Sequence, residues 1–332
     1  MKKILLIQTG GTIAMDIGDD NNPTLDTDRW TQLLYEAIPE LSKIADIQSK
    51  QLFSEDSSDI NKKHWSKLAT FIHEHYRDYN GFVVLHGTDT MAYTASALSF
   101  ALQNLDKPII FTGSQVPMRN IRSDARRNLI NAIEMATMPL PEVAICFNDF
   151  VYRGNRATKM SIGDFDAFSS PNYSPLAEIG LNIEISDHIL SPAQKLQVST
   201  EFNDQVFLQK IHPNLNPKYL QQIDFSNIRA LIIEAFGSGN FPIHGEQSLL
   251  PFFKRCVDED TLLIITSQAD YDAVELNNYE SGRKAIELGA LSAKDMTTEA
   301  TLTKIMYLLG KYDKTQNIIN AFNHNIAGEI TE

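Results

Sequence analysis

Hydrophobic positions in the first half of the chain alternate between short continuous runs and longer segments with helical spacing. Apolar residues that recur every three or four positions predict helices over residues 27–38, 61–79, 91–100 and 122–136. The short runs predict strands over residues 2–8, 81–86, 107–114 and 142–147. Because these runs are continuously apolar, they are typical of parallel strands that helices cover on both faces.

The alternation stops between about residue 150 and residue 210 and then resumes. Residues 151–161 have the pattern of a hairpin, and residues 169–194 are rich in Pro and Ser. In the last third of the chain, the pattern predicts strands over 228–236 and 261–268, and helices over 245–257 and around residues 280, 300 and 318.

This order of elements predicts an α/β protein with two domains. At 332 residues, the chain is too long for one ordinary hydrophobic core. We expect a larger N-terminal catalytic domain over residues 1–188, with a doubly wound, mostly parallel sheet. A linker over residues 189–208 and a smaller C-terminal α/β domain over residues 209–332 would follow.

Charge and hydropathy exclude two classes of partner. The net charge of -13 disfavours nucleic-acid binding, which needs clustered Lys and Arg. No segment approaches the ~18 consecutive apolar residues of a membrane span. The apolar run at residues 4–7 is also shorter than the roughly 7 to 15 residues of a secretory signal core. We therefore expect no nucleic-acid partner and no membrane partner.

The cysteines and histidines do not form a metal-site pattern. Cys146 and Cys256 are the only cysteines, and they lie far apart in the sequence. This usage is not a disulfide framework and suits a reducing compartment, so we expect a cytoplasmic protein. The HEH segment at 73–75 has no third ligand nearby and is more typical of a solvated helix face.

Small polar residues follow directly after five of the predicted strands. They are TGGT (9–12), HGTDT (86–90), TGSQ (112–115), GSGN (237–240) and TSQ (266–268). Ligands of open parallel sheets bind outside the carboxyl ends of the strands, and glycine permits close approach of the backbone. We therefore predict that the functional site lies among these segments.

Thr88 and Asp89 stand between a predicted strand and a predicted helix. Each residue taken alone has a simpler interpretation, because Asp or Thr in front of a helix is usually an N-cap that contributes about 1 kcal/mol. Thr12 alone could likewise belong to a strand-to-helix turn. Taken together, five strand ends that all carry hydroxyls or amides exceed what turn formation requires.

The chain lacks the motifs of several common site types. It has no G-x-S-x-G elbow, no Walker A sequence and no G-x-G-x-x-G after the first strand. Without a suitably placed His, a Thr or Ser nucleophile would need another activating group, for which Lys is the natural candidate. Lys159 in YRGNRATK is the lysine that we single out, although a basic surface hairpin would have the same sequence pattern.

Seven segments together resemble the bacterial cytoplasmic (type I) L-asparaginases of the asparaginase–glutaminase family. In chain order they are TGGTIAM, DSSD, HGTDTMAYTASALSF, TGSQVPM, RSD, YRGNRATK and DMTTEATLTK. The resemblance extends from the first predicted strand to the C-terminal region, and the paired T-G-G-T-I and H-G-T-D-T motifs are specific to this family.

The resemblance implies hydrolysis of L-asparagine to L-aspartate and ammonia, without a metal or an organic cofactor. Thr12 matches the family's first threonine, usually taken as the nucleophile. Thr88, Asp89 and Lys159 match its second catalytic cluster. In that cluster, a lysine beside an acid tunes a threonine that activates water or acts as the nucleophile itself.

The resemblance also implies how the substrate is bound. Asp56, Ser57 and Ser58 match the segment that holds the α-carboxylate and amino group, with Asp89 also contacting the ammonium. Asn240 matches a residue that a neighbouring subunit contributes in many members. The active site would therefore lie at a subunit interface, within a homodimer or homotetramer. The set of substrate-binding residues that we predict also includes Gly87 and Ser114.

Two positions depart from the family pattern. The segment after Thr12 usually carries a tyrosine that assists this threonine, but here no tyrosine precedes Tyr35, and Asn21 or Asn22 stands near its place. A regulatory cysteine of the type I enzymes is replaced by Ala269. Two alternatives therefore stay open, namely a hydrolase of a related amino-acid amide and a non-catalytic asparagine-binding sensor.

Overall fold

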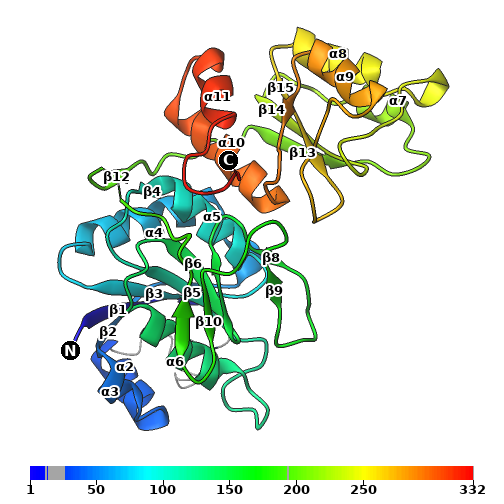
Figure 1. The fold of residues 1–332 in the computed structure, drawn as a ribbon. Coiled ribbons are helices and arrows are strands. Elements are labelled where there is room, and N and C mark those ends of the chain that lie inside the picture. The colour runs from blue at the N-terminus through cyan, green and yellow to red at the C-terminus, as the bar shows by residue number, and fades with distance from the viewer. Residues whose placement is uncertain (12, 14–26, 193, 332) are drawn as a thin grey trace. The chain divides into compact units, whose positions relative to one another are not determined.

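The computed structural model describes residues 1–11, 13, 27–192 and 194–331 of the chain (Figure 1). These residues divide into two compact units, Met1–Thr200 and Glu201–Glu332. The division falls inside residues 189–208, the stretch that the sequence predicts as a linker. Among the described residues, no helix combines the length and apolar character that crossing a bilayer requires.

The first unit is built on an eight-stranded sheet, counting only the strands that the structure describes, in the order β11-β10-β7-β6-β5-β3-β1-β2. The neighbouring strands β2, β1, β3, β5 and β6 are parallel to one another. The pairs β6–β7, β7–β10 and β10–β11 are each antiparallel. They span Lys3–Gly10 (β1), Asp46–Glu55 (β2), Gly81–Leu85 (β3), Ile109–Thr112 (β5), Val143–Phe147 (β6), Phe150–Arg153 (β7), Ala177–Ile179 (β10) and Ile183–Ile185 (β11).

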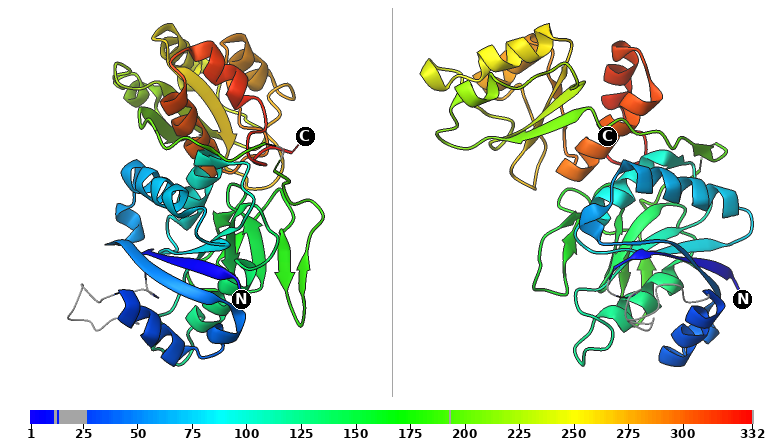
Figure 2. Two further views of the ribbon diagram at one scale, coloured as in Figure 1. Left: turned by 90° about the vertical axis from the view of Figure 1, so that its left-hand side faces the viewer. Right: turned by 180° about the vertical axis from the view of Figure 1, so that it is seen from behind.

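Helices cover both faces of this sheet (Figures 1 and 2). One face carries α2 (Thr27–Ala37), α3 (Leu41–Ile44) and α6 (Ala125–Met135), whose apolar residues share one core with β1, β3 and β5. The other face carries α4 (Lys62–His75) and α5 (Met91–Ala101). All residues of β3 and β6 are buried, which is why their sequences are continuously apolar. The predicted mostly parallel, doubly covered sheet is therefore confirmed.

The second unit holds a smaller sheet with the order β13-β14-β15-β16 among its described strands, all of them parallel. These strands span Val206–Lys210 (β13), Ala230–Ala235 (β14), Leu262–Ser267 (β15) and Leu291–Ser292 (β16). Its helices are α7 (Pro217–Leu220), η2 (Gly245–Gln247), α8 (Leu250–Asp258), α9 (Glu280–Glu287), α10 (Thr298–Lys311) and α11 (Thr315–Phe322). The predicted smaller C-terminal α/β domain is confirmed.

Strand β2 has no counterpart among the predicted strands. It is the edge strand of the sheet, and its burial is largely restricted to alternate residues such as Ile47 and Ser49. An edge strand that packs on one side alone needs no continuous apolar run, so the sequence criterion missed it. This strand ends directly before Asp56 and the short helix η1 (Ser57–Asp59).

The predicted hairpin over residues 151–161 is wrong. Strand β7 instead pairs with β6 across the turn at 148–149, and β8 (Thr158–Lys159) pairs with β9 (Phe168–Ser169). The stretch therefore joins the second strand of one hairpin to the first strand of the next. Its polar character reflects this junction, in which Asn155 and Arg156 are nonetheless buried.

Part of the predicted linker is paired or anchored within the first unit. The short strand β12 (Gln197–Val198) pairs with β4 (Leu102–Gln103). The Leu190 N–H donates to Glu142, and the Arg153 guanidinium donates to the carbonyl of His188, the residue directly before the linker. Arg153 and Glu142 form an ion pair, with Nε to Oε2 at 2.6 Å, and both side chains are at most 3% exposed.

We expect Arg153→Met to destabilise the protein strongly, by about 3 to 5 kcal/mol, because the buried Glu142 carboxylate loses its countercharge. The double variant Arg153→Met/Glu142→Leu removes both charges and is expected to be more stable than the single variant. Thermal and urea unfolding of the three proteins measures this difference. A single variant as stable as the native protein would contradict the assignment.

Candidate active site

The carboxyl ends of β1, β2, β3 and β5 lie at one edge of the sheet, because these strands are parallel. The segments that follow them approach one another more closely than side chains would allow. A Cβ on Gly10 would lie 2.1 Å from the Glu55 carbonyl oxygen, and a Cβ on Gly11 would lie 2.7 Å from the Gly87 nitrogen. Both glycines also have positive φ angles, of 117° and 83°. Glycine is required there for conformation and for space.

The same close packing continues to the next segments. A Cβ on Gly87 would lie 2.7 Å from Cβ and Oγ of Ser57, and a Cβ on Gly113 would lie 2.4 Å from the His86 carbonyl oxygen. The Thr90 hydroxyl donates to the Ser57 carbonyl at 2.6 Å. Residues 9–11 and the DSS, HGTDT and TGSQ segments therefore meet at the edge of the sheet, as the strand-end rule predicts for three of these four segments.

Lys159 lies against the HGTDT segment, although 70 residues separate it from Asp89 in the sequence. Its Nζ donates to Thr88 Oγ1 at 2.8 Å and to Asp89 Oδ1 at 2.6 Å. The Lys159 side chain is 15% exposed and that of Asp89 is 67% exposed. The structure thus brings together three of the four residues predicted as catalytic. The fourth, Thr12, lies outside the described residues.

The capping interpretation of Asp89 does not describe its role. Helix α5 begins at Met91, its N-cap residue is Thr90, and no side chain makes a capping hydrogen bond there. The Asp89 carboxylate instead pairs with Lys159. An exposed carboxylate and a shielded ammonium lie side by side, beside a hydroxyl that can take part in proton transfer.

Asp56 is held by the residues that follow it. Its Oδ1 accepts hydrogen bonds from the Ser58 N–H at 2.8 Å and from the Ser58 hydroxyl at 2.7 Å. These bonds, that of the N–H foremost, lower the pKa of the Asp56 carboxyl below its ordinary value. Asp56 and Ser58 are exposed, while Ser57 is buried against Gly87. A fixed, ionised carboxylate at the surface suits the binding of an ammonium group.

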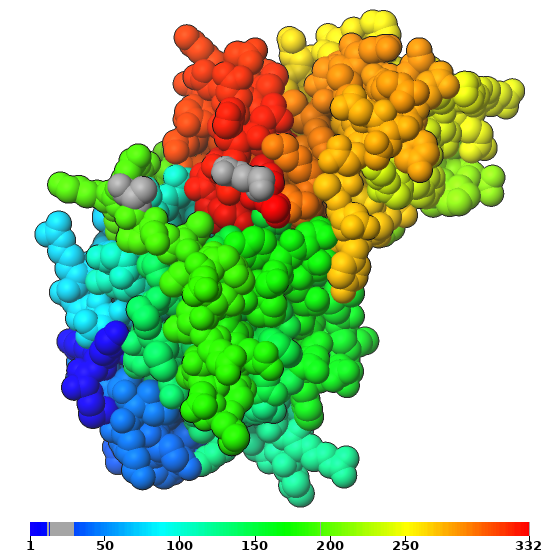
Figure 3. All heavy atoms as spheres, viewed as in Figure 1, coloured from blue at the N-terminus to red at the C-terminus, as the bar shows by residue number. Residues whose placement is uncertain are grey.

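Gln115 is a site residue that the sequence did not single out. Thr88 Oγ1 donates to Gln115 Oε1 at 3.1 Å. The backbone N–H of Gln115 donates to both carboxylate oxygens of Asp124, at 3.1 and 3.0 Å. The loop between β5 and α6 that begins here projects from the surface of the first unit (Figure 3). The position of Gln115 one residue after Ser114, within a strand-end segment, was the available signal.

The other predicted binding residues occupy different settings. Ser114 is buried, and its hydroxyl makes no hydrogen bond within the part of the chain that the structure describes. Asn240 lies in the second unit, where its Oδ1 accepts hydrogen bonds from the Phe241 N–H at 3.1 Å and the Ser281 hydroxyl at 2.5 Å. Asn21 and Asn22, which stand near the place of the family tyrosine, lie outside the described residues.

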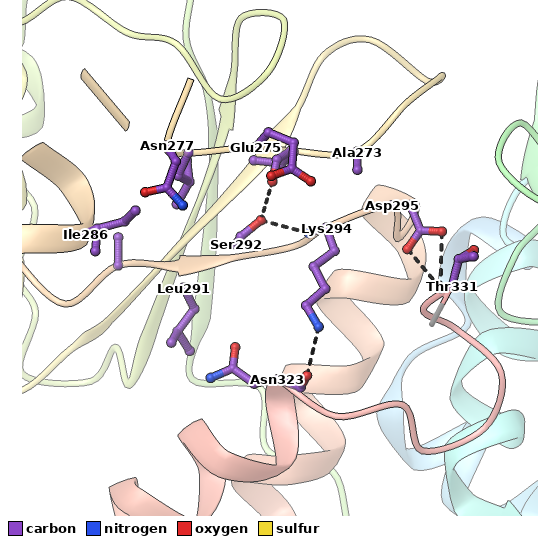
Figure 4. Close-up of a pocket in the computed structure, with 13 residues that line it drawn as sticks. Ala273, Glu275, Asn277, Ile286, Leu291, Ser292, Lys294, Asp295, Asn323 and Thr331 are labelled. Atoms are coloured by element: carbon purple, nitrogen blue, oxygen red, sulfur yellow. Dashed lines mark hydrogen bonds between the residues drawn. The ribbon is translucent and has the colours of Figure 1, made fainter. Parts of the chain in front are cut away.

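A separate cavity of about 450 Å³ lies in the second unit (Figure 4). Two of its charged groups, those of Lys294 and Asp295, are engaged with the C-terminal segment. Lys294 Nζ donates to the Asn323 carbonyl at 3.0 Å, and the Asp295 carboxylate accepts from the Thr331 N–H at 3.2 Å. We assign no chemistry to this cavity, because these groups already serve the fold.

We expect Gly11→Ala to destabilise the protein by ~1 kcal/mol or more, since a methyl group at a positive φ is strained and meets the Gly87 backbone. Gly180→Ala is the matched control, because a Cβ there has only the Asn182 carbonyl oxygen within 4 Å, at 3.8 Å. Thermal unfolding compares the two variants. Equal melting temperatures would show that the close approach is not needed.

The burial of His86 predicts that the protein loses stability in acid. Burial lowers its pKa from 6.5 to about 4, and its Nδ1 lies 2.7 Å from the Gly87 carbonyl oxygen. Above pH 6.5, the ordinary pKa, His86 is neutral in both the folded and the unfolded chain. Its contribution to the free energy of unfolding is therefore fully present there. As pH falls from 6.5 toward 4, only the unfolded chain takes the proton, and stability falls by ~3 kcal/mol.

His86→Gln is expected to flatten this part of the curve of unfolding free energy against pH. The control is His73→Gln, which replaces an exposed histidine of α4. Urea unfolding at a series of pH values from 7 to 4 measures the slope in each protein. If the native protein and His86→Gln lose stability in parallel, His86 is not the group responsible.

Comparison with known proteins gives matches over nearly the whole chain. Residues 3–191 match the family described as "Asparaginase, N-terminal", and residues 205–322 match "Glutaminase/Asparaginase C-terminal domain". L-asparaginase 1 of Escherichia coli strain K12 is 37% identical over 336 aligned residues, which cover 99% of this chain and 98% of that protein.

Solved structures match the fold over the same extent. The thermostable L-asparaginase from Thermococcus kodakarensis has a TM-score of 0.88 at 33% identity, covering 99% of each chain. L-asparaginase I from Vibrio cholerae has a TM-score of 0.88 at 34% identity, covering 100% of this chain and 99% of that one.

Proposed function

This chain belongs to the asparaginase family, and we propose on that basis that it hydrolyses L-asparagine to L-aspartate and ammonia. The resemblance found in the sequence motifs is thereby confirmed at the level of the family. The observation that carries the proposal for the site is the contact of Lys159 with both Thr88 and Asp89 at the carboxyl edge of the sheet.

An amide is a poor electrophile, so a covalent route that divides the reaction into acylation and hydrolysis suits this substrate. In our proposal, Thr12 attacks the side-chain amide first. Thr88, hydrogen-bonded to Lys159, activates water for the second step or serves as a nucleophile itself. Backbone N–H groups of the glycine-rich segments would stabilise the negative charge that develops on the amide oxygen.

The substrate's α-amino and α-carboxylate groups are assigned to the DSS segment and its neighbours. The ionised Asp56 and the exposed Asp89 suit the ammonium, and the substrate carboxylate is assigned to Ser57 and Ser58, as the resemblance implies. Gly87 and Ser114 complete the set at the ends of β3 and β5. Such a site discriminates strongly, because a ligand that lacks either charged group leaves polar groups without partners.

We also propose a homodimer or homotetramer in which Asn240 of one subunit completes the site of another. Asn240 is exposed, and the bonds to Phe241 and Ser281 use only its Oδ1. Cys146 and Cys256 are both buried free thiols, which supports a reducing, cytoplasmic location. The domain limits of 1–188, 189–208 and 209–332 likewise remain our proposal.

The test is release of ammonia from L-asparagine at neutral pH by the native protein, Thr12→Ala and Lys159→Met. We expect activity in the native protein and a loss of at least about 100-fold in each variant, since each removes a nucleophile or its activator. Lys107→Met, a lysine outside this site whose Nζ donates to backbone carbonyls, is the control and should stay active.

Binding of asparagine without ammonia release would contradict the hydrolase and indicate a sensor. Release of ammonia from another amino-acid amide, but not from L-asparagine, would instead indicate a related amidohydrolase. Full activity in Lys159→Met would contradict the assigned site but would agree with the proposed reaction.

A further inference from the structure

The orientation of the Gln115 side-chain amide is determined by its surroundings. Its Nε2 lies 3.1 Å from the Ser161 carbonyl oxygen and 3.3 Å from the Asp164 carbonyl oxygen. Carbonyl oxygens only accept hydrogen bonds, so the amide nitrogen must face them. The amide oxygen of Gln115 therefore faces Thr88.

This orientation sets the direction of every hydrogen bond in the cluster. Because Gln115 Oε1 only accepts, the Thr88 hydroxyl must give its single proton to it, across 3.1 Å. Thr88 Oγ1 then has only lone pairs to offer Lys159, so Lys159 Nζ donates to it at 2.8 Å. Lys159 also donates to Asp89 at 2.6 Å, and thus acts as a donor toward both partners.

Both ends of Gln115 are held firmly. Its backbone N–H is bound by the Asp124 carboxylate, which also accepts from the Val116 N–H at 3.1 Å. The two carbonyls that fix its amide belong to the loop between β8 and β9. In that loop, Ser161 Oγ accepts from the Gly163 N–H at 3.2 Å and the Asp164 N–H at 3.0 Å. A flip of the amide would place its oxygen against two carbonyl oxygens.

We propose that Gln115 is a positioning residue that directs the Thr88 proton away from Lys159. The inference rests on the proposed hydrolysis of asparagine, and it takes the activation of Thr88 to be the transfer of its proton to Lys159. That transfer breaks the Oγ1–H bond of Thr88 and forms an N–H bond on Lys159, whose ammonium must first give a proton to the Asp89 carboxylate, 2.6 Å away. It therefore requires the hydroxyl to turn away from Gln115.

The charged groups of this cluster and of the segments bound to it come from three elements. Asp89, in front of α5, forms the ion pair with Lys159. Asp164 and Asp166 lie in the loop between β8 and β9, where the Asp164 side chain accepts from the Asp166 N–H and the Asp166 side chain accepts from Asn148. Asp124, before α6, binds the backbone of Gln115. None of the variants below changes these carboxylates.

The experiment measures kcat and KM for L-asparagine against pH in the native protein, Gln115→Met and Gln115→Glu. Met removes the acceptor, so the Thr88 hydroxyl becomes free to donate to a neutral Lys159. We expect the pH of half-maximal kcat on the acid side to move down by about half a unit or more. We also expect KM to change little, because Gln115 is not among the residues assigned to the substrate.

Gln115→Glu is expected to move the same midpoint in the opposite direction. It keeps one acceptor oxygen for Thr88 and places the other against the Ser161 and Asp164 carbonyls, and its negative charge favours the protonated lysine. Gln103→Met is the control, since Gln103 also donates to a backbone carbonyl, that of Phe100, but lies in β4. It should leave the profile unchanged.

A purely structural role for Gln115 would lower kcat equally at every pH and leave the midpoint in place, which would overturn the proposal. Midpoints that move in the same direction in both variants would overturn it as well. Absence of asparagine hydrolysis by the native protein would instead refute the proposed function, so the two failures are distinguishable. If Gln115→Met does not fold, the direction of the shift in Gln115→Glu still decides.

Discussion

The close approach of backbone segments at the carboxyl edge of the large sheet is the constraint on which the site depends. A Cβ on Gly10, Gly11, Gly87 or Gly113 would lie between 2.1 and 2.7 Å from atoms of a neighbouring segment. These glycines let the segments after four parallel strands pack directly on one another. The hydroxyls and carboxylates that follow them are thereby placed by backbone contacts, which vary less than side-chain contacts do.

A second set of constraints brings Lys159 to this edge from a distant part of the chain. The preceding residues Asn155 and Arg156 are buried, and Arg153 is fixed by its ion pair with the buried Glu142. The Lys159 side chain leaves this buried stretch and reaches Thr88 and Asp89. The lysine therefore needs little ordering when substrate binds, which suits a group that must exchange a proton at one particular oxygen.

Gln115 joins these two sets of constraints. Its backbone belongs to the segment after β5, and its amide binds the loop that follows Lys159. A single side chain thus relates the position of the lysine to the direction of the Thr88 hydroxyl. Hydrogen-bond direction matters here as much as distance, because a hydroxyl has only one proton to give.

The sequence by itself determined the α/β class, four of the five parallel strands that the structure describes in the large sheet and the contribution of Thr88 and Asp89 to a strand-end site. These features are local, because a buried parallel strand must be continuously apolar and its last residues must lie at the edge of the sheet. The edge strand β2 and the pairing of β7 with β6 were decided only by the tertiary structure. So were the ion pair of Glu142 with Arg153 and the contacts of Gln115 and Lys159. Such contacts join residues far apart in the chain, and no spacing along the sequence encodes which distant groups the fold brings within hydrogen-bonding distance.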